Sequence, residues 1–187
     1  SQVVIDSPVD AMELGIGMIH QHFKLVEVFT ATENIILGTR EKLQNPRALR
    51  EQILELGRSV GLEVDPDKRV YDMSVSEKQT VEILKVLYRK ARILILDEPT
   101  AVLTPQETDR LFTILRRMRE QGCAIIIITH KLQEVLSLSD RVTILWRGKS
   151  IDTVQTAQTD ARQLTELMVG RPVSLQIDRP QPPETPR

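Results

Sequence analysis

The stretch Ile93-Leu94-Ile95-Leu96-Asp97-Glu98-Pro99-Thr100 decides the fold of this chain. Four aliphatic residues in a row are typical of a strand that is covered on both faces in a parallel sheet. Two carboxylates follow at the carboxyl end, the edge where α/β proteins bind ligands. Adjacent strand residues point to opposite faces, so Asp97 and Glu98 are expected to have different roles. An ordinary strand end explains Asp-Glu alone, but the aliphatic run and the Pro-Thr that follows favour a functional site.

Further strands are expected on both sides of this one. Short apolar runs alternate with helical patterns, which predicts an α/β protein with a largely parallel sheet. A long, mostly helical insert occupies about residues 30–91, and its clearest helical periodicity covers residues 47–60. From residue 171 onward the chain is rich in proline, which is typical of a linker or tail, 171–187. The other predicted strands are 16–20, 124–129, 142–146 and 150–154. The strand 124–129 is also almost wholly aliphatic, so we expect it to be covered on both faces.

Two helix starts are specified by capping boxes. Ser74 with Glu77, and Thr104 with Glu107, each provide an N-cap hydroxyl and a returning carboxylate three residues later. The backbone N–H groups at a helix start can also bind a phosphate, so Ser74 is compatible with a structural cap and with an anion site.

Composition excludes several classes of protein. The 187 residues carry 25 Lys+Arg and 26 Asp+Glu, a net charge of −1, which argues against a nucleic-acid binder. Cys123 is the single cysteine, so no internal disulfide is possible and a reducing compartment is expected. No apolar run approaches the ~18–20 residues that cross a bilayer. We therefore expect a cytosolic globular chain.

A histidine ends a second strand of the predicted sheet. His130 follows the strand 124–129, and an imidazole at a carboxyl edge can bind a phosphate oxygen or an attacking water. A lone histidine in such a place is more often simply solvated. Its pairing with the Asp97-Glu98 strand favours a function.

The residues now assembled resemble the ATP-binding cassette (ABC) ATPases, from about residue 5 to Arg171. The resemblance also includes Ile16-Gly17-Met18-Ile19-His20-Gln21-His22-Phe23 and Met73-Ser74-Val75-Ser76-Glu77-Lys78-Gln79. It is closest to the first cassette of tandem importers for simple sugars and nucleosides. It implies a P-loop NTPase (RecA-like) parallel sheet with an inserted helical subdomain. Residues 1–170 would then form a partial cassette, and 171–187 a linker to a second one.

The resemblance implies site residues as well. Asp97 and Gln21 would serve Mg²⁺, Glu98 would be the catalytic glutamate and His130 the switch histidine. The signature segment would complete the ATP site of the opposite cassette, although Ser76 stands where the family has glycine and restricts close approach of the backbone. The residues that the resemblance assigns to ATP are Gln21, Ser74, Ser76 and Gln79.

One family motif is absent from the sequence. No Gly-x-x-x-x-Gly-Lys-Ser/Thr occurs, and Gly148-Lys149-Ser150 fails because position 143 is threonine and the next residues continue as strand. The resemblance places this loop upstream of Ser1, so we expect an N-terminally truncated cassette that lacks the P-loop strand and the N-terminal β-lobe. Tight MgATP binding by the isolated chain then has no physical basis, and we expect it to be inactive alone.

The resemblance implies an ATP-hydrolysing subunit of an importer for nucleosides or simple sugars. Its partners would be transmembrane permease subunits, a second cassette and, indirectly, a solute-binding protein, but no nucleic acid. Its location would be cytoplasmic, peripheral on the inner face of the cell membrane. Two alternatives remain: a non-catalytic docking module for a permease, and a soluble ABC ATPase outside transport.

Overall fold

The computed structural model describes residues 3–39 and 45–169. These residues form two compact units, which divide between His130 and Lys131. The predicted tail, 171–187, lies outside the described residues.

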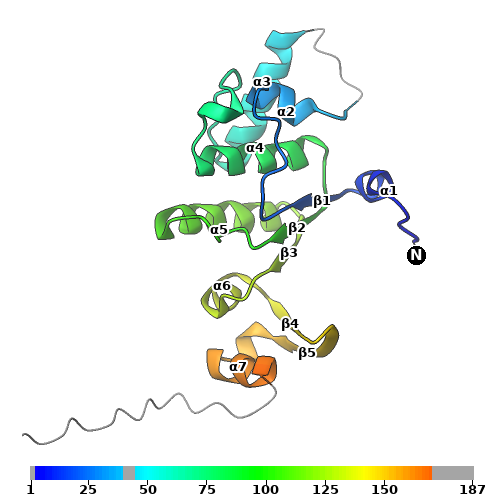
Figure 1. Ribbon diagram of the computed structural model, residues 1–187, viewed down its shortest axis with the longest axis vertical. Coiled ribbons are helices and arrows are strands. Elements are labelled where there is room, and N and C mark those ends of the chain that lie inside the picture. Colours follow the sequence, from blue (N-terminus) through cyan, green and yellow to red (C-terminus); the bar gives the residue numbers. More distant parts are fainter. Residues whose placement is uncertain (1–2, 40–44, 170–187) are drawn as a thin grey trace, which may run out of the picture. The chain divides into compact units, whose positions relative to one another are not determined.

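The first unit contains a three-stranded parallel sheet (Figure 1). Its strands are β1 (Ile16–Ile19), β2 (Ile93–Asp97) and β3 (Ala124–Ile128), in the order β1-β2-β3. All three were predicted from their aliphatic runs, and the parallel direction of the sheet is confirmed. The central strand is the one that carries Asp97 at its carboxyl end.

Helices occupy every connection of this sheet. Short α1 precedes β1, the helical insert lies between β1 and β2, and α5 lies between β2 and β3. Thr104 caps α5 and Ser74 caps α4, both through the predicted capping boxes. The helical elements of this unit are α1 (Pro8–Glu13), α2 (Ala31–Ile36), α3 (Pro46–Val60), the 3₁₀ turn η1 (Val70–Asp72), α4 (Val75–Tyr88) and α5 (Pro105–Glu120).

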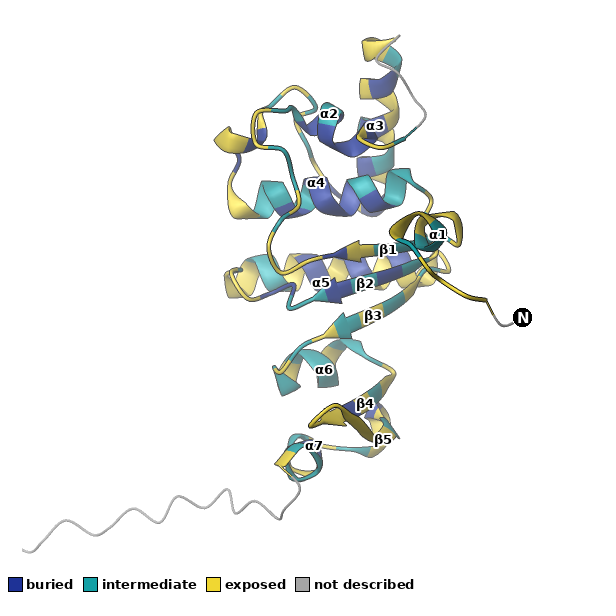
Figure 2. Cartoon of the chain, turned by 45° about the vertical axis from the view of Figure 1, so that its right-hand side comes forward, coloured by how far each residue is buried: buried dark blue, intermediate teal, exposed yellow. Residues whose placement is uncertain are grey.

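Helix α4 is buried on more than one side. It contacts α2, α3 and β1, and Figure 2 shows dark blue, buried segments along it. Its apolar residues Val81 and Leu84 are both fully buried. Three polar or charged positions, Gln79, Glu82 and Lys85, interrupt the apolar pattern, and the first two are also buried.

Strand β3 differs from the prediction that it is covered on both faces. Alternate residues of this strand are exposed, and the Ile126 and Ile128 side chains are 50% and 49% accessible. Met18 of β1 is in register with Ile95 and hence with Ile126, and it is also exposed. The reason is geometric: β3 is an edge strand, and within the first unit this face of the sheet is partly open. The aliphatic composition alone could not reveal this.

The second unit is a β-hairpin with flanking helices. Strands β4 (Arg141–Trp146) and β5 (Lys149–Gln155) pair antiparallel. Arg147 and Gly148 at the turn both have positive φ, as a tight two-residue hairpin requires. Ile144 and Leu164 are its buried apolar residues. Its elements are α6 (Leu132–Leu138), β4 (Arg141–Trp146), β5 (Lys149–Gln155), the 3₁₀ turn η2 (Thr156–Gln158) and α7 (Ala161–Val169).

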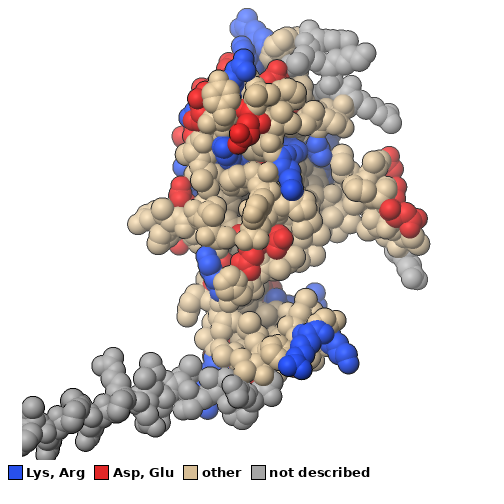
Figure 3. All heavy atoms as spheres, viewed as in Figure 1, with Lys and Arg blue, Asp and Glu red and all other residues tan. Residues whose placement is uncertain are grey.

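Charges of both signs are interspersed on the face of the first unit that Figure 3 shows. This agrees with the net charge of −1. Over residues 3–39 and 45–169, no helix has the length and apolar character needed to span a bilayer.

Candidate functional site

Three strand ends meet at one edge of the sheet in the first unit. Asp97, the last residue of β2, is paired with Ile128, the last residue of β3, and β1 ends one position earlier. Gln21 and His130 each follow their own strand by two residues. Neighbouring strands lie about 4.8 Å apart, so the backbone at Gln21, Asp97 and His130 is gathered at one edge.

Glu98 and His130 form the central contact of this edge. The Nδ1 atom of His130 lies 2.8 Å from Oε1 of Glu98. The histidine side chain is 74% exposed, whereas that of Glu98 is 19% exposed. The other carboxylate oxygen, Oε2, is buried and has no hydrogen-bond partner in the described part of the chain. One oxygen is therefore engaged by the imidazole, and the other remains available to a further donor.

The backbone at Glu98 adopts an uncommon conformation. Its φ is +46°, in the left-handed region that a residue with a β-carbon rarely enters. Such strain costs on the order of 1–3 kcal/mol and persists only where the surroundings fix it. The Glu98 N–H donates to the carbonyl of Ile128 at 2.9 Å, and the Ala101 N–H donates to the carbonyl of Glu98 at 3.1 Å. These bonds hold the turn that aims the carboxylate.

Gln79 lies beneath this turn. Its side chain is buried, and its amide Nε2 donates to the carbonyl of Pro99 at 3.0 Å. The resemblance assigned Gln79 to ATP, but the structure places its amide against the residue that follows Glu98. Helix α4 is thereby tied to the segment that carries the candidate catalytic glutamate.

Ser74 and Ser76 lie at the start of α4. The Glu77 N–H donates to Oγ of Ser74 at 3.3 Å, and the Ser74 N–H donates to the Glu77 carboxylate at 2.8 Å. Nζ of Lys68 also donates to this carboxylate, at 2.7 Å. The Lys68 contact has the larger effect and the bond from the Ser74 N–H the next, and together they hold the pKa of Glu77 below its usual value.

Ser76 faces a different environment. It lines a cavity of about 310 Å³ beside Glu63, Asp65, Glu77 and Arg110. Within the described residues, no hydrogen bond or ion pair joins Ser74 or Ser76 to Glu98 or His130. The structure thus groups Gln21, Asp97, Glu98 and His130 at one edge and leaves the two serines at the helix start.

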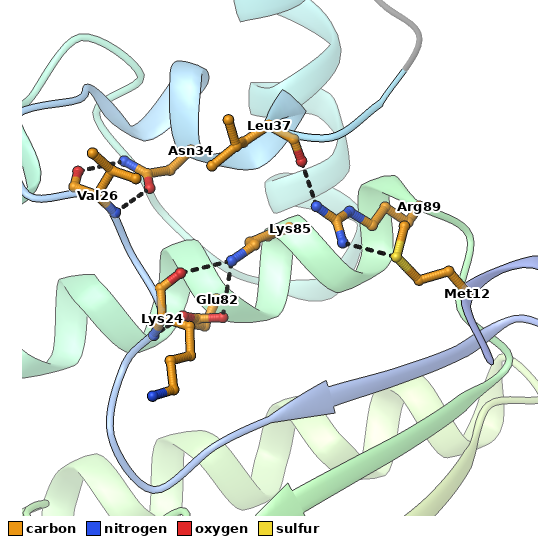
Figure 4. A network of polar contacts seen from close by, with 8 residues as sticks. All are labelled: Met12, Lys24, Val26, Asn34, Leu37, Glu82, Lys85 and Arg89. Carbon is orange, nitrogen blue, oxygen red and sulfur yellow. Dashed lines mark hydrogen bonds and ion pairs between the residues drawn. The ribbon is translucent and has the colours of Figure 1, made fainter. Parts of the chain in front are cut away.

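Two polar clusters that the sequence reasoning missed hold the loop after Gln21 (Figure 4). Buried Asn34 accepts from the Val26 N–H at 2.7 Å and donates to the Val26 carbonyl at 3.0 Å. Glu82 accepts from the Lys24 N–H at 2.6 Å, and Nζ of Lys85 donates to the Lys24 carbonyl at 2.9 Å. A carboxylate inside an otherwise apolar stretch of helix was the sequence signal for this cluster.

The donor atoms at the sheet edge suit a hard cation. Mg²⁺ prefers oxygen ligands and usually takes only one or two carboxylates, with water and phosphate completing its shell. Asp97 supplies a carboxylate and Gln21 an amide oxygen. In the part of the chain that the structure describes, no group of three His, Cys, Asp or Glu side chains could hold a metal by itself. The chemistry of these two oxygen donors fits Mg²⁺, with water and phosphate oxygens as its remaining ligands.

Several known proteins that are similar to this chain belong to one family. Residues 3–101 match the ABC transporter family. The nucleoside import ATP-binding protein NupA of Lactococcus lactis is 53% identical over 173 residues, which are 91% of this chain and 34% of that protein. The ribose import ATP-binding protein RbsA 1 of Streptomyces avermitilis is 42% identical, over 97% of this chain and 35% of its own. The chain thus spans about a third of the length of these curated relatives.

A solved structure shares the fold. That of cbiO1 from Clostridium perfringens, part of the ABC transporter complex cbiONQ, superposes with a TM-score of 0.70 and 26% identity. The match covers 88% of this chain and 67% of that one. The parallel sheet, its helical insert and the family match over residues 3–101 place this chain in the ABC transporter family, as part of an ABC cassette with a mixed α/β fold.

Proposed function

We propose that the chain is part of the ATP-hydrolysing subunit of an importer, with nucleosides as the transported class and simple sugars as the alternative. The observation that carries the proposal is the Glu98–His130 pair at the sheet edge, with one carboxylate oxygen engaged and one buried and unpaired within the described residues. One relative, 53% identical, is named for nucleoside import, and another, 42% identical, for ribose import; these names support nucleosides as the first choice and simple sugars as the second.

The two oxygens of Glu98 have different tasks in this mechanism. Oε1 accepts a hydrogen bond from the Nδ1–H group of His130, which fixes the orientation of both side chains. Oε2 then accepts a proton from the attacking water, as a general base requires a free acceptor within hydrogen-bond reach. The His130 side chain is 74% exposed, and its Nε2 atom is left to contact a phosphate oxygen. Asp97 and Gln21 would hold Mg²⁺, which would supply positive charge against the phosphate oxygens.

The partners follow from the family. The N-terminal end of α4, capped by Ser74 and followed by Ser76, contributes to the nucleotide site of a second cassette through its N–H groups. Gln79 belongs to the same segment but acts inward, on Pro99. The cassette pair works with transmembrane permease subunits at the cytoplasmic face of the membrane, and with a solute-binding protein through them.

The phosphate cradle is not supplied by these 187 residues, because the sequence has no Gly-x-x-x-x-Gly-Lys-Ser/Thr motif. We expect the 187-residue chain by itself to bind MgATP more weakly than a micromolar dissociation constant, which corresponds to about −8 kcal/mol. Isothermal titration calorimetry with MgATP measures this. A micromolar or tighter affinity would contradict the expectation.

The function is tested in the intact polypeptide that carries this sequence, assembled with its permease. Glu98→Gln should lower kcat for ATP hydrolysis by about 100-fold or more, with little change in KM for ATP, because only the general base is lost. Glu120→Gln, an exposed substitution at the end of α5, is the matched control. Unchanged hydrolysis in Glu98→Gln refutes the proposal. Permease binding without any hydrolysis by the parent protein would instead identify a docking module.

A further inference from the structure

Polar residues of α4 make two sets of contacts that have no role in the proposed hydrolysis mechanism. Gln79, Glu82 and Lys85 follow one another at intervals of three residues, so they lie along one side of the helix. Gln79 binds the segment after Glu98, and the other two bind the loop after Gln21. One helix thus touches both strand-end loops of the candidate site.

The tie to the loop is made through the backbone. Lys24 donates its N–H to Oε1 of Glu82 at 2.6 Å, and its carbonyl accepts from Nζ of Lys85 at 2.9 Å. Oε2 of Glu82 lies 3.7 Å from the same Nζ. The Glu82 side chain is only 4% exposed, so breaking the pair would leave a buried charge without its partner. We call these contacts the Glu82–Lys85 clamp. Because the clamp binds backbone groups, it fixes the position of the peptide at Lys24 whatever side chain that residue carries.

The tie to the turn acts one residue beyond the candidate base. The buried amide of Gln79 holds the Pro99 carbonyl at 3.0 Å, directly after the positive φ of Glu98. A backbone kept in a strained conformation needs such external contacts to stay there. Losing this contact would let the turn relax and would move the carboxylate away from its contact with His130.

We propose that α4 is a positioning element for the catalytic edge, in which Gln79 sets the Glu98 turn and the Glu82–Lys85 clamp sets the loop after Gln21. A displacement at the Ser74 end of the helix then reaches both loops together. The inference rests on the proposed ATPase function. Gln79, Glu82 and Lys85 are positioning residues, because each acts through backbone groups rather than on a nucleotide.

The positioning role of Gln79 is tested by ATPase kinetics in the intact polypeptide with its permease. Gln79→Leu removes the donor, and Gln79→Glu replaces it with an acceptor that repels the Pro99 carbonyl. Both should lower kcat by about 10- to 100-fold while KM for ATP stays constant, since a shift on the order of 1 Å at a catalytic group can cost about 100-fold. Gln52→Leu, an exposed glutamine of α3, is the matched control. In a Glu98→Gln background, Gln79→Leu should cause no further loss.

The clamp is tested by hydrogen exchange, which does not depend on activity. Glu82→Ala should raise the exchange rate of the Lys24 amide about tenfold or more, because its acceptor is gone. Glu82→Gln retains a side-chain oxygen at the same place and should restore most of the protection. Glu51→Ala, at an exposed ion pair with Arg47, should leave the Lys24 amide unchanged.

The outcomes separate the inference from the function on which it rests. A parent protein without ATPase activity overturns the proposed function, and the exchange data then decide the clamp. An active parent whose Gln79 variants keep the full kcat overturns the positioning role of Gln79 and leaves the function standing. If Gln79→Leu fails to fold, as circular dichroism would reveal, the kcat of Gln79→Glu decides between these results. Equal exchange in Glu82→Ala and the unmodified protein overturns the clamp.

Discussion

Gly17 sets the spacing between β1 and α4, and replacing it gives a quantitative test of the packing. A β-carbon at Gly17 would lie 2.2 Å from Cγ1 of Val86 and 3.3 Å from Cβ of Ala91. Carbon atoms in contact are normally about 3.5–4.0 Å apart. The first distance is therefore more than about 1 Å too short, and either the valine or the whole helix must move.

The expected cost of Gly17→Ala is about 1–3 kcal/mol in the free energy of unfolding, the usual range for overpacking a buried site. Val86 is buried, so Val86→Ala alone should cost about 2 kcal/mol through the two methyl groups that it removes. In the double variant, the new β-carbon occupies the space that Cγ1 has left. The two losses should therefore fall short of additivity by about 1–2 kcal/mol.

Urea denaturation of the unmodified chain and the three variants, followed by circular dichroism, measures all four free energies. The sign of the coupling is the decisive result, because two independent sites would add within about 0.5 kcal/mol. Additive losses would mean that β1 and α4 are not packed as described. The same outcome would weaken the argument that α4 is held in a fixed position above the sheet edge.

Individual contacts give three further predictions. The pKa of Glu77 is depressed in the folded chain, so this carboxylate stabilises the fold fully at pH values above its usual pKa of 4.5. The stabilisation is lost as the pH falls through the lower pKa of the folded state. Glu77→Gln should remove this pH dependence from denaturation curves. Asn34→Ala should cost about 2–3 kcal/mol, since three hydrogen bonds of a buried amide disappear, and a loss of under about 0.5 kcal/mol in the same assay would contradict the network. Burial raises the pKa of the Cys123 thiol, so its reaction with a thiol reagent near neutral pH should be slower than in the urea-unfolded chain, and equal rates would refute this.

Local signals in the sequence predicted much of the fold. The aliphatic runs placed the strands, and the Ser74 and Thr104 capping boxes placed the starts of α4 and α5 to the residue. These features are encoded by neighbours in the chain, which is why a pattern reveals them. The grouping of Asp97 with His130 at one sheet edge also followed from parallel topology alone.

Contacts between distant segments were beyond the same reasoning. The bond from Gln79 to Pro99 joins residues 20 positions apart, and that from Lys24 to Glu82 joins residues 58 apart. The residues next to either partner do not indicate which distant residue it contacts. The sequence pattern shows only that a polar residue interrupts an apolar helix. The open face of β3 was missed for the opposite reason, because aliphatic composition is the same whether a neighbour covers Ile126 or not.

The left-handed backbone at Glu98 also bears on how this position can change in a directed-evolution experiment. Glycine relieves the strain at once, and asparagine or aspartate tolerates it better than glutamate does. A library screened only for heat resistance should therefore drift toward these three residues at position 98. A library screened for the proposed solute uptake should keep glutamate. The difference between the residues that the two screens select measures how strongly stability and function are opposed at this position.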